Sequence, residues 1–351
     1  SGKISGDVVT LNVSGATGSF ASRNVARDAN GAVTAQTVTL STSGSLSGAD
    51  ASNYIFSASA PTTMATITPA TLTVSGAIVS AKTYDGTTAA ALANGILSGV
   101  IGQDNVTLSG GGAFADKNAG SGKSVTTAYV LGGSDEGNYI LTQPTGLTGT
   151  INAKALTITA PSIAAKTYDG TTNAGALTLG TLSGFVGSET VTATGTAGAL
   201  SSANAGSRTA DVSYTLANGT NGGLASNYTL ATTTGVTALV NAKALTITAP
   251  SIAVKTYDGT TGAGALTQGT LSGFVGSETV TATGTAGALS SANAGSRTAD
   301  VSYTLANGTN GGLASNYTLA TTTGVSALVN AKALTITAPS IAAKTYDGTT
   351  G

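Results

Sequence analysis

The chain has 351 residues, of which 49 are Gly and only 8% are charged, and it contains no Cys, His or Trp. Its net charge of −1 and its 40% hydrophobic residues exclude a disordered polyelectrolyte, because apolar burial can offset the entropy lost on ordering. Its 14 scattered Lys and Arg residues form no basic stripe, so we expect no nucleic-acid partner. No run of 18 apolar residues occurs, so no membrane span is predicted.

Internal repetition dominates the sequence. The string KTYDGTT begins at four lysines spaced by 84, 89 and 89 residues, and an Asn-Tyr pair recurs at spacings of 85, 89 and 89. A period of this size predicts tandem copies of one structural unit. The markers divide the chain into a partial repeat at 1–70, complete repeats at 71–154, 155–243 and 244–332, and a partial repeat at 333–351.

Several segments, taken in chain order, predict strands. Residues 1–9 align with residues 98–106, so 1–70 corresponds to the C-terminal part of a repeat. Each complete repeat opens on an LTV or LTI segment, and later stretches such as ADVSYTLA alternate apolar and polar residues as half-buried strands do. The junctions at 150–160 and 239–249 contain no Gly or Ser, which predicts a stiff connection. Residues 333–351 match the opening strands of a repeat.

These patterns predict an all-β fold. Roughly six or seven short strands per repeat are separated by Gly, Asn, Asp and Ser clusters, and no stretch has convincing helical spacing. We expect tandem antiparallel β-sandwiches of immunoglobulin-like size, joined in a rigid rod. A β-grasp-like repeat is the alternative.

The KTYDGTT string has a chemical and a structural interpretation. As a chemical cluster it would offer Lys166, Tyr168 and Asp169, but a chain without His or Cys lacks the usual base and nucleophile partners, so no catalytic residue is predicted. As a structural motif, Asp-Gly makes a turn with positive φ at Gly170, while the Tyr ring is buried. We favour the structural motif. Its residues are the Tyr-Asp-Gly triplets and the Asn-Tyr pairs, namely Tyr84, Asp85, Gly86, Tyr168, Asp169, Gly170, Tyr257, Asp258, Gly259, Tyr346, Asp347, Gly348, Asn53, Tyr54, Asn138, Tyr139, Asn227, Tyr228, Asn316 and Tyr317.

No cofactor and no dedicated metal site are predicted. The two later repeats carry only three carboxylates each, which are too widely spaced for a local calcium loop of six to eight oxygens. An intramolecular amide crosslink would require Lys166, Asn204 and Glu189 to meet in one core, and the sequence leaves that open. Asn-x-Thr sequences, the acceptors of N-linked glycans, occur at Asn105, Asn218, Asn227, Asn307 and Asn316.

The pattern LTV, KTYDGTT, LSGVIGQDNVTL, GAFADKNAG, GNY and TINAK closely resembles the YDG and MBG repeats of filamentous-haemagglutinin-like bacterial adhesins. The copy at 71–154 matches best. In the later repeats ALSSANAG replaces AFADKNAG, and Leu224 and Leu313 replace Asp135. The resemblance implies a long fibre outside the cell or on the bacterial surface, secreted through an outer-membrane export partner.

We therefore expect an extracellular structural stalk or fibre that spaces a binding tip or builds biofilm filaments, and we expect no enzymatic activity. In the alternative, the repeats themselves bind polysaccharide or associate with a second copy. The mismatched ends have two explanations. Either the sequence is a window on a longer array, or residues 333–351 donate strands to the incomplete segment 1–70 of the next molecule.

Overall fold

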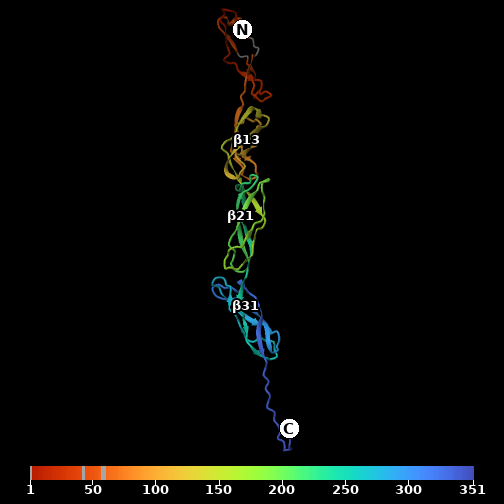
Figure 1. Cartoon of the computed structure of the whole chain (residues 1–351). Helices are drawn as coiled ribbons and strands as arrows, with labels where there is room; N and C mark the ends of the chain where they lie inside the picture. The colour runs from red at the N-terminus through yellow and green to blue at the C-terminus, as the bar shows by residue number, and fades with distance from the viewer. Residues whose placement is uncertain (1, 42–43, 57–60) are drawn as a thin grey trace. The chain divides into compact units, whose positions relative to one another are not determined.

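The computed structural model describes residues 2–41, 44–56 and 61–351, and its regular structure in these ranges is almost entirely β-strand (Figure 1). The prediction of an all-β chain built from tandem repeats is confirmed. Within the described residues, the helical elements are four 3-10 turns of three residues each. None of the helices described could cross a membrane, since each is too short and insufficiently apolar.

The chain divides into two compact units. Unit 1 contains Ser1–Ala155, Phe185–Thr192 and Asn218–Thr229, and unit 2 contains Leu156–Gly184, Ala193–Ala217 and Leu230–Gly351. The second complete repeat is thus shared between them. Its contacts with the first complete repeat fall within unit 1, and its contacts with the third fall within unit 2.

The first complete repeat, in unit 1, has two main sheets and a two-stranded ribbon. One sheet has the order β11-β6-β14 and the other β8-β15-β13-β12-β9, while the ribbon pairs β10 with β7. The bounds are β6 Ala70–Ser75, β7 Ile78–Val79, β8 Lys82–Thr83, β9 Ala89–Ala90, β10 Leu92–Ala93, β11 Ile96–Ser98, β12 Thr107–Phe114, β13 Gly120–Gly132, β14 Tyr139–Thr142 and β15 Thr148–Asn152, with the 3-10 turn η2 at Glu136–Asn138.

The sheets are mixed, which corrects the expectation of purely antiparallel pairing. β14 pairs in parallel with β6, and β15 pairs in parallel with β8, while β11 with β6 and β12 with β13 are antiparallel. The alternation of apolar residues could not distinguish the two cases, because it has a period of two in both. The long chain between β6 and β14 supplies the crossover that a parallel pair requires. The repeat also has ten strands rather than six or seven, because the two-residue strands lie in turn-rich sequence.

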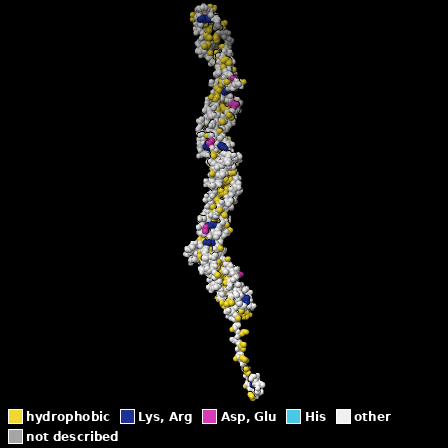
Figure 2. Space-filling model, in the orientation of Figure 1, with side chains coloured by type: hydrophobic (Ala, Val, Ile, Leu, Met, Phe, Trp, Pro, Cys, Tyr) yellow, Lys and Arg dark blue, Asp and Glu magenta, His cyan; other side chains and the backbone are white. Residues whose placement is uncertain are grey.

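Alternation along the long strands explains the core. In β13, Val125, Thr127 and Tyr129 are buried, and the residues between them are exposed. Leu72 on β6 and Phe114 on β12 are also buried. On the face drawn in Figure 2, Lys, Arg, Asp and Glu side chains are few and lie singly or in small groups among uncharged atoms, consistent with the low charge content.

The second and third complete repeats follow the same plan. In the third repeat, which lies in unit 2, the sheets have the orders β29-β25-β32, β27-β33-β31-β30 and β26-β28, with β25–β32 and β27–β33 again parallel. The bounds in the second repeat are β16 Lys154–Ile158, β17 Ser162–Ile163, β18 Lys166–Thr167, β19 Leu177–Thr178, β20 Leu182–Ser183, β21 Val191–Ala197, β22 Gly206–Asn218, η3 Ala225–Asn227, β23 Tyr228–Leu230 and β24 Thr233–Asn241. Those in the third are β25 Lys243–Ile247, β26 Ser251–Ile252, β27 Lys255–Thr256, β28 Leu266–Thr267, β29 Leu271–Ser272, β30 Val280–Ala286, β31 Gly295–Asn307, η4 Ala314–Asn316, β32 Tyr317–Leu319 and β33 Thr322–Asn330.

The partial repeat at 1–70 forms two small sheets. β1 pairs with β4, and β3 lies between β2 and β5. The bounds are β1 Thr10–Asn12, β2 Gly18–Phe20, β3 Gln36–Leu40, β4 Ser45–Ser47, η1 Ala51–Asn53 and β5 Thr62–Ala65. Val38 is buried, whereas Phe20, whose counterpart Phe114 is buried, is 40% exposed.

Residues 331–351 form no strand, although 333–351 matches strand-forming sequence in the complete repeats. The corresponding strand β25 is held between β29 and β32, and 331–351 pairs with no strand in the described part of the chain. Leu334 is therefore 91% exposed, whereas its counterpart Leu245 is buried.

Candidate functional site: the tyrosine–carboxylate junctions

The KTYDGTT string folds into a loop closed by its own side chains. Asp85 Oδ1 accepts hydrogen bonds from the backbone N–H (2.9 Å) and Oγ1 (2.8 Å) of Thr87, and Lys82 Nζ lies 2.7 Å from the same oxygen. Lys82 Nζ also donates to the Thr87 carbonyl at 3.0 Å. Gly86 takes φ 80°, the positive value predicted for this turn. The contacts recur around Asp169, Asp258 and Asp347.

The lysine of each loop lowers the pKa of its aspartate. In the second repeat, the hydrogen bond from Lys166 lowers the pKa of Asp169 to about 2, and the bonds from Thr171 act in the same direction. Lys255 similarly lowers the pKa of Asp258 to about 2. Both loops thus carry a charge-paired aspartate at neutral pH, and the lysine ammonium is bound rather than free to react.

The tyrosine of the loop points out of its own repeat and into the next one. Within unit 1, Tyr84 is 2% exposed, and its Oη donates to Glu189 Oε1 of the following repeat at 2.7 Å. Tyr228 Oη donates to Glu189 Oε2 at 2.7 Å, and the Tyr84 and Tyr228 rings meet edge to face at 5.5 Å. Lys117 Nζ lies 2.8 Å from Glu189 Oε1. One buried carboxylate thus joins two tyrosines and a lysine from two repeats.

This environment shifts the pKa values of all four groups. Burial opposes ionisation of Glu189, but hydrogen bonds from Lys117, Tyr84 and Tyr228 outweigh it and lower the carboxyl pKa. Burial, followed by the bond to Glu189, raises the pKa of Tyr84. Burial also raises the pKa of Tyr228 to about 12. The hydrogen bond to Glu189 raises the pKa of Lys117. At neutral pH the cluster therefore contains a carboxylate, an ammonium and two neutral phenols.

The junction between the first and second complete repeats is expected to weaken in acid. Because the pKa of Glu189 in the folded chain is below its usual value of 4.5, the carboxylate stabilises the fold above about pH 4.5. That contribution is lost as the pH falls through the lowered pKa. We expect hydrogen-exchange protection of the Ala119 amide to decrease across this range, and Glu189→Gln to abolish this step. An unchanged pH profile in the variant would contradict the assignment.

The junction between the second and third complete repeats contains the same cluster without the lysine. Within unit 2, Tyr168 Oη donates to Glu278 Oε1 at 2.7 Å, and Tyr317 Oη donates to Glu278 Oε2 at 2.6 Å. The two rings again meet edge to face, at 5.6 Å, and burial raises the pKa of Tyr168 to about 12. Ala203 stands where the first complete repeat has Lys117. The pair of tyrosine rings is thus present at both junctions, whereas the lysine is present at only one of the two.

Two asparagines join the same repeats beside each cluster. In unit 1, Asn227 Oδ1 accepts the Ala119 N–H (2.8 Å), and Asn227 Nδ2 donates to Asn118 Oδ1 (3.1 Å). In unit 2, Asn316 makes the same pair of contacts, with the Ala205 N–H and with the Asn204 side chain. Asn227 and Asn316 are 0% exposed, so neither is accessible to a glycan in the folded chain.

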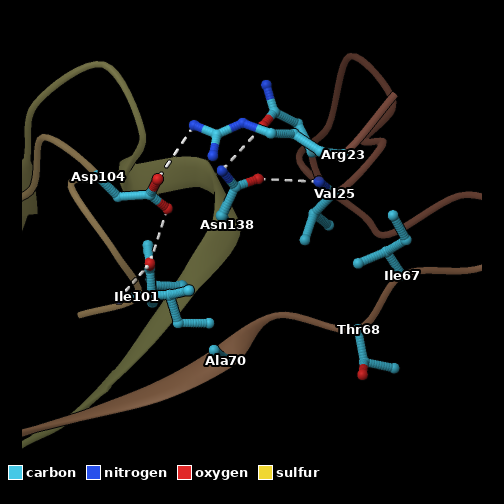
Figure 3. Close-up of a pocket in the computed structure, with 10 residues that line it drawn as sticks. Arg23, Val25, Ile67, Thr68, Ala70, Ile101, Asp104 and Asn138 are labelled. Atoms are coloured by element: carbon cyan, nitrogen blue, oxygen red, sulfur yellow. Dashed lines mark hydrogen bonds and ion pairs between the residues drawn. The ribbon is translucent and has the colours of Figure 1, made fainter. Parts of the chain in front are cut away.

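The junction between the partial repeat and the first complete repeat has the asparagine pair and a cation (Figure 3). Asn138 Oδ1 accepts the Val25 N–H at 2.8 Å, and Asn138 Nδ2 donates to Asn24 Oδ1 at 3.1 Å. Arg23 Nη2 lies 3.0 Å from Asp104 Oδ1. Tyr139 Oη donates to Asp104 Oδ2 at 2.8 Å. Arg23 and Asp104 correspond to Lys117 and Glu189 at the next junction.

The remaining predicted motif residues lie in different surroundings in the described part of the chain. Tyr257 is 40% exposed and Tyr346 is 94% exposed, unlike the buried Tyr84 and Tyr168. At the other end, Tyr54 Oη donates to Asp7 Oδ2 at 2.6 Å, and the Asn53 N–H donates to the Asp50 carbonyl at 3.1 Å. The Asn-Tyr pair was predicted only as part of the structural motif, and the acids that receive the tyrosine hydroxyls were not predicted. Their signal was the recurrence of an acid at one position of every repeat, at Asp7, Asp104, Glu189 and Glu278.

The alternative chemical sites receive no geometric support. Lys166 is bound to its own loop through Thr171, and Asn204 is bound to Asn316, so these two members of the crosslink hypothesis are engaged with separate partners. Among the residues that the structure describes, no cluster of three or more His, Cys, Asp or Glu side chains is arranged to hold a metal ion.

The fold and the junctions define the class: an all-β protein of tandem repeats, in which the first complete repeat is joined to the second, and the second to the third, through tyrosine, carboxylate and asparagine side chains. A model of the YDG domain matches residues 68–146, 152–235 and 241–324, and the chain belongs to the YDG domain family. This confirms the predicted YDG repeats. Each match begins three residues before the predicted repeat start, at 71, 155 and 244.

Among solved structures, the crystal structure of N-cadherin EC1-4 from Drosophila is similar to 94% of this chain over 94% of its own length. The identity is 10% and the TM-score is 0.24. No curated protein matches the sequence.

Proposed function

We propose that the chain is a structural spacer, a stalk of YDG repeats that holds a binding region away from a bacterial surface or forms part of an extracellular fibre. The observation that carries the proposal is the recurrence of one junction. Tyr84 and Tyr168 each enter the following repeat and donate to a carboxylate, Glu189 or Glu278. Repeats connected by such contacts resist bending more than repeats joined by a flexible linker.

The connection between repeats is also short. One residue separates β15 from β16 and one separates β24 from β25, so each boundary combines a nearly continuous strand with side-chain contacts in the adjacent loops. Such direct interfaces suit a protein that must hold two parts at a fixed separation or transmit force between them. In these clusters the tyrosines donate to the carboxylates, and the asparagines beside them bond to one another and to the backbone. Such contacts serve a structural role, and we propose no enzymatic activity.

The surface location is part of the same proposal. It is supported by the resemblance to repeats of filamentous-haemagglutinin-like adhesins and by a composition without cysteine, which suits a secreted chain that folds without disulfides. Secretion would then depend on an outer-membrane export partner. Labelling intact cells that express the full protein with an antibody to the repeats tests the location, and antigen detected only after lysis would contradict it.

Small-angle X-ray scattering of the 351-residue chain tests the spacer itself. Four repeat equivalents of roughly 30–40 Å each, arranged in a stiff line, give a radius of gyration of about 40 Å, whereas a compact chain of this length gives about 20 Å. We expect the larger value. The double variant Glu189→Ala and Glu278→Ala is expected to broaden the distribution of lengths, because both junction carboxylates are lost. A radius near 20 Å would reject the spacer.

A further inference from the structure

The outer edge of the large sheet is closed in the first complete repeat. There β9 pairs antiparallel with β12, and the register places Ala90 opposite Gly112 and Ala89 opposite Ala113. Only small side chains therefore meet at this edge. Gly110 on β12 takes φ 121°, which regular strands do not have. A covering strand and a distorted backbone are both ways in which proteins keep an edge strand from pairing with another chain.

The third complete repeat lacks this cover. Its large sheet ends at β30, whose only neighbouring strand in the described part of the chain is β31. The segment 261–266 corresponds to 88–92, which contains β9, but it is one residue longer. No strand of the described structure corresponds to β9, since β28, which begins at Leu266, corresponds to β10 and pairs with β26. One side of β30 is therefore open among the described residues.

The second complete repeat has the same open edge at β21, whose neighbour among the described strands is β22. Residues 173–175 and 195–199 line a groove of about 440 Å³, and no strand pair joins them in the described structure. Within this groove, Gly198 and Ala199 correspond to Gly112 and Ala113, which pair with β9 in the first repeat. The missing strand thus leaves an open groove beside the edge.

Both open strands have the sequence VTATGTA. On β30, Thr281, Thr283 and Thr285 are exposed, and the register with β31 is continuous from Val280 to Ala286. The strand contains no charged residue and no Pro, and no residue in it has a positive φ. Charged side chains, Pro and bulges are devices that protect natural edge strands, and β30 has none of them.

An identical strand from a second copy matches this edge. When two copies of β30 lie antiparallel about Thr283, Thr283 faces Thr283 of the other copy, and Thr281 faces Thr285. Cross-strand Thr pairs are favourable, and no like charges meet because the strand has none. Apart from Val280 the strand consists of Ala, Gly and Thr, so its side chains are small like those of β9. β21 has the same sequence and therefore offers the same contact.

We propose that β21 and β30 are docking sites for a second copy of this chain. The edge strand of one copy adds antiparallel to an edge strand of the other, so that two sheets become one. This is strand addition, in which main-chain hydrogen bonds supply the affinity. The inference is independent of the proposed spacer role and surface location, because a stiff chain that stays monomeric rejects the pairing and leaves the spacer standing.

Introduced cysteines test the contact directly, because the 351-residue chain contains no Cys. The test variant carries Thr194→Cys and Thr283→Cys, the middle residues of the two edge strands, and we expect a disulfide-linked dimer on non-reducing gels. The matched control carries Thr215→Cys and Thr304→Cys. Thr304 is exposed and lies opposite Thr283, but one strand further from the edge. Two such positions would be about 14 Å apart across the paired edges, beyond the roughly 7 Å that a disulfide allows, so the control should not crosslink.

Sedimentation of the unmodified chain measures the association itself. We expect a dimer that Thr194→Lys with Thr283→Lys weakens at least about fivefold, because lysines directly opposite each other repel. Thr215→Lys with Thr304→Lys adds the same charge one strand inward and should weaken the dimer less. A chain that stays monomeric up to about 1 mM, equal crosslinking of the two cysteine variants, or association that the edge lysines leave unchanged would each overturn the proposal.

Discussion

Replacing Tyr84 with Ala is expected to lower the free energy of opening of the junction between the first two complete repeats by about 3–5 kcal/mol. The ring is buried and packs edge to face on Tyr228, and its hydroxyl is bound to Glu189. The substitution therefore removes aromatic volume and one partner of a buried carboxylate. Native-state hydrogen exchange at the Ala119 amide, which is bonded across the junction to Asn227, measures the loss.

The third repeat offers a matched control for this experiment. Tyr257 lies in the same KTYDGTT string, and the Lys255 and Asp258 contacts of its loop match those of the first repeat, but the ring is 40% exposed. Tyr257→Ala is expected to lower the free energy of unfolding by less than about 1 kcal/mol, because little buried surface is lost. Equal losses at the two positions would show that the tyrosine stabilises only its own loop.

Replacing Glu189 with Ala is expected to have a comparable effect, about 3–5 kcal/mol on the same exchange measurement. The side chain is 7% exposed, and it accepts hydrogen bonds from Tyr84 and Tyr228 and pairs with Lys117. Its removal leaves two buried hydroxyls and an ammonium without their acceptor, and an unsatisfied buried group costs more than the net value of the bond it made.

Glu136→Ala is the control for this substitution. Glu136 is an exposed glutamate in η2 of the same unit, and its loss is expected to change the stability by no more than about 0.5 kcal/mol. Glu189→Gln should retain part of the stability, because an amide oxygen can still accept from a tyrosine. A Glu189→Ala variant that exchanges as slowly as Glu136→Ala would contradict the role assigned to the carboxylate.

The sequence predicted the repeats, the strands and the turn at Asp85 and Gly86, because these depend on local chemistry and on period. It also predicted that the loop tyrosine is buried, but not against which residues. The local sequence is the same whether the tyrosine is buried in the core of its own repeat or against the following repeat. Tyr84 and Tyr257 lie in the same KTYDGTT string, yet Tyr84 packs against the second complete repeat and is buried, whereas Tyr257 is 40% exposed.

The acids and asparagines of the junctions were harder to predict. The sequence suggested Glu189 and Asn204 only as members of an open crosslink hypothesis, because a polar residue in a Gly-rich loop gives no indication of its partner. Their contacts join residues more than 100 positions apart, such as Asn204 and Asn316. Comparing corresponding positions across the repeats would have been more informative, since an acid and an Asn-Tyr pair recur together in every copy.

The junctions have a consequence for how such a gene can change in length. The second complete repeat carries Glu189 and Asn227, which receive the preceding repeat, and also Tyr168 and Asn204, which enter the following one. A duplicated copy therefore fits both of its new neighbours at once. The segments 166–254 and 255–343 differ at only four of 89 positions, as a recent duplication would leave them. Recombination between such copies can add or remove whole repeats while every surviving boundary keeps its partners.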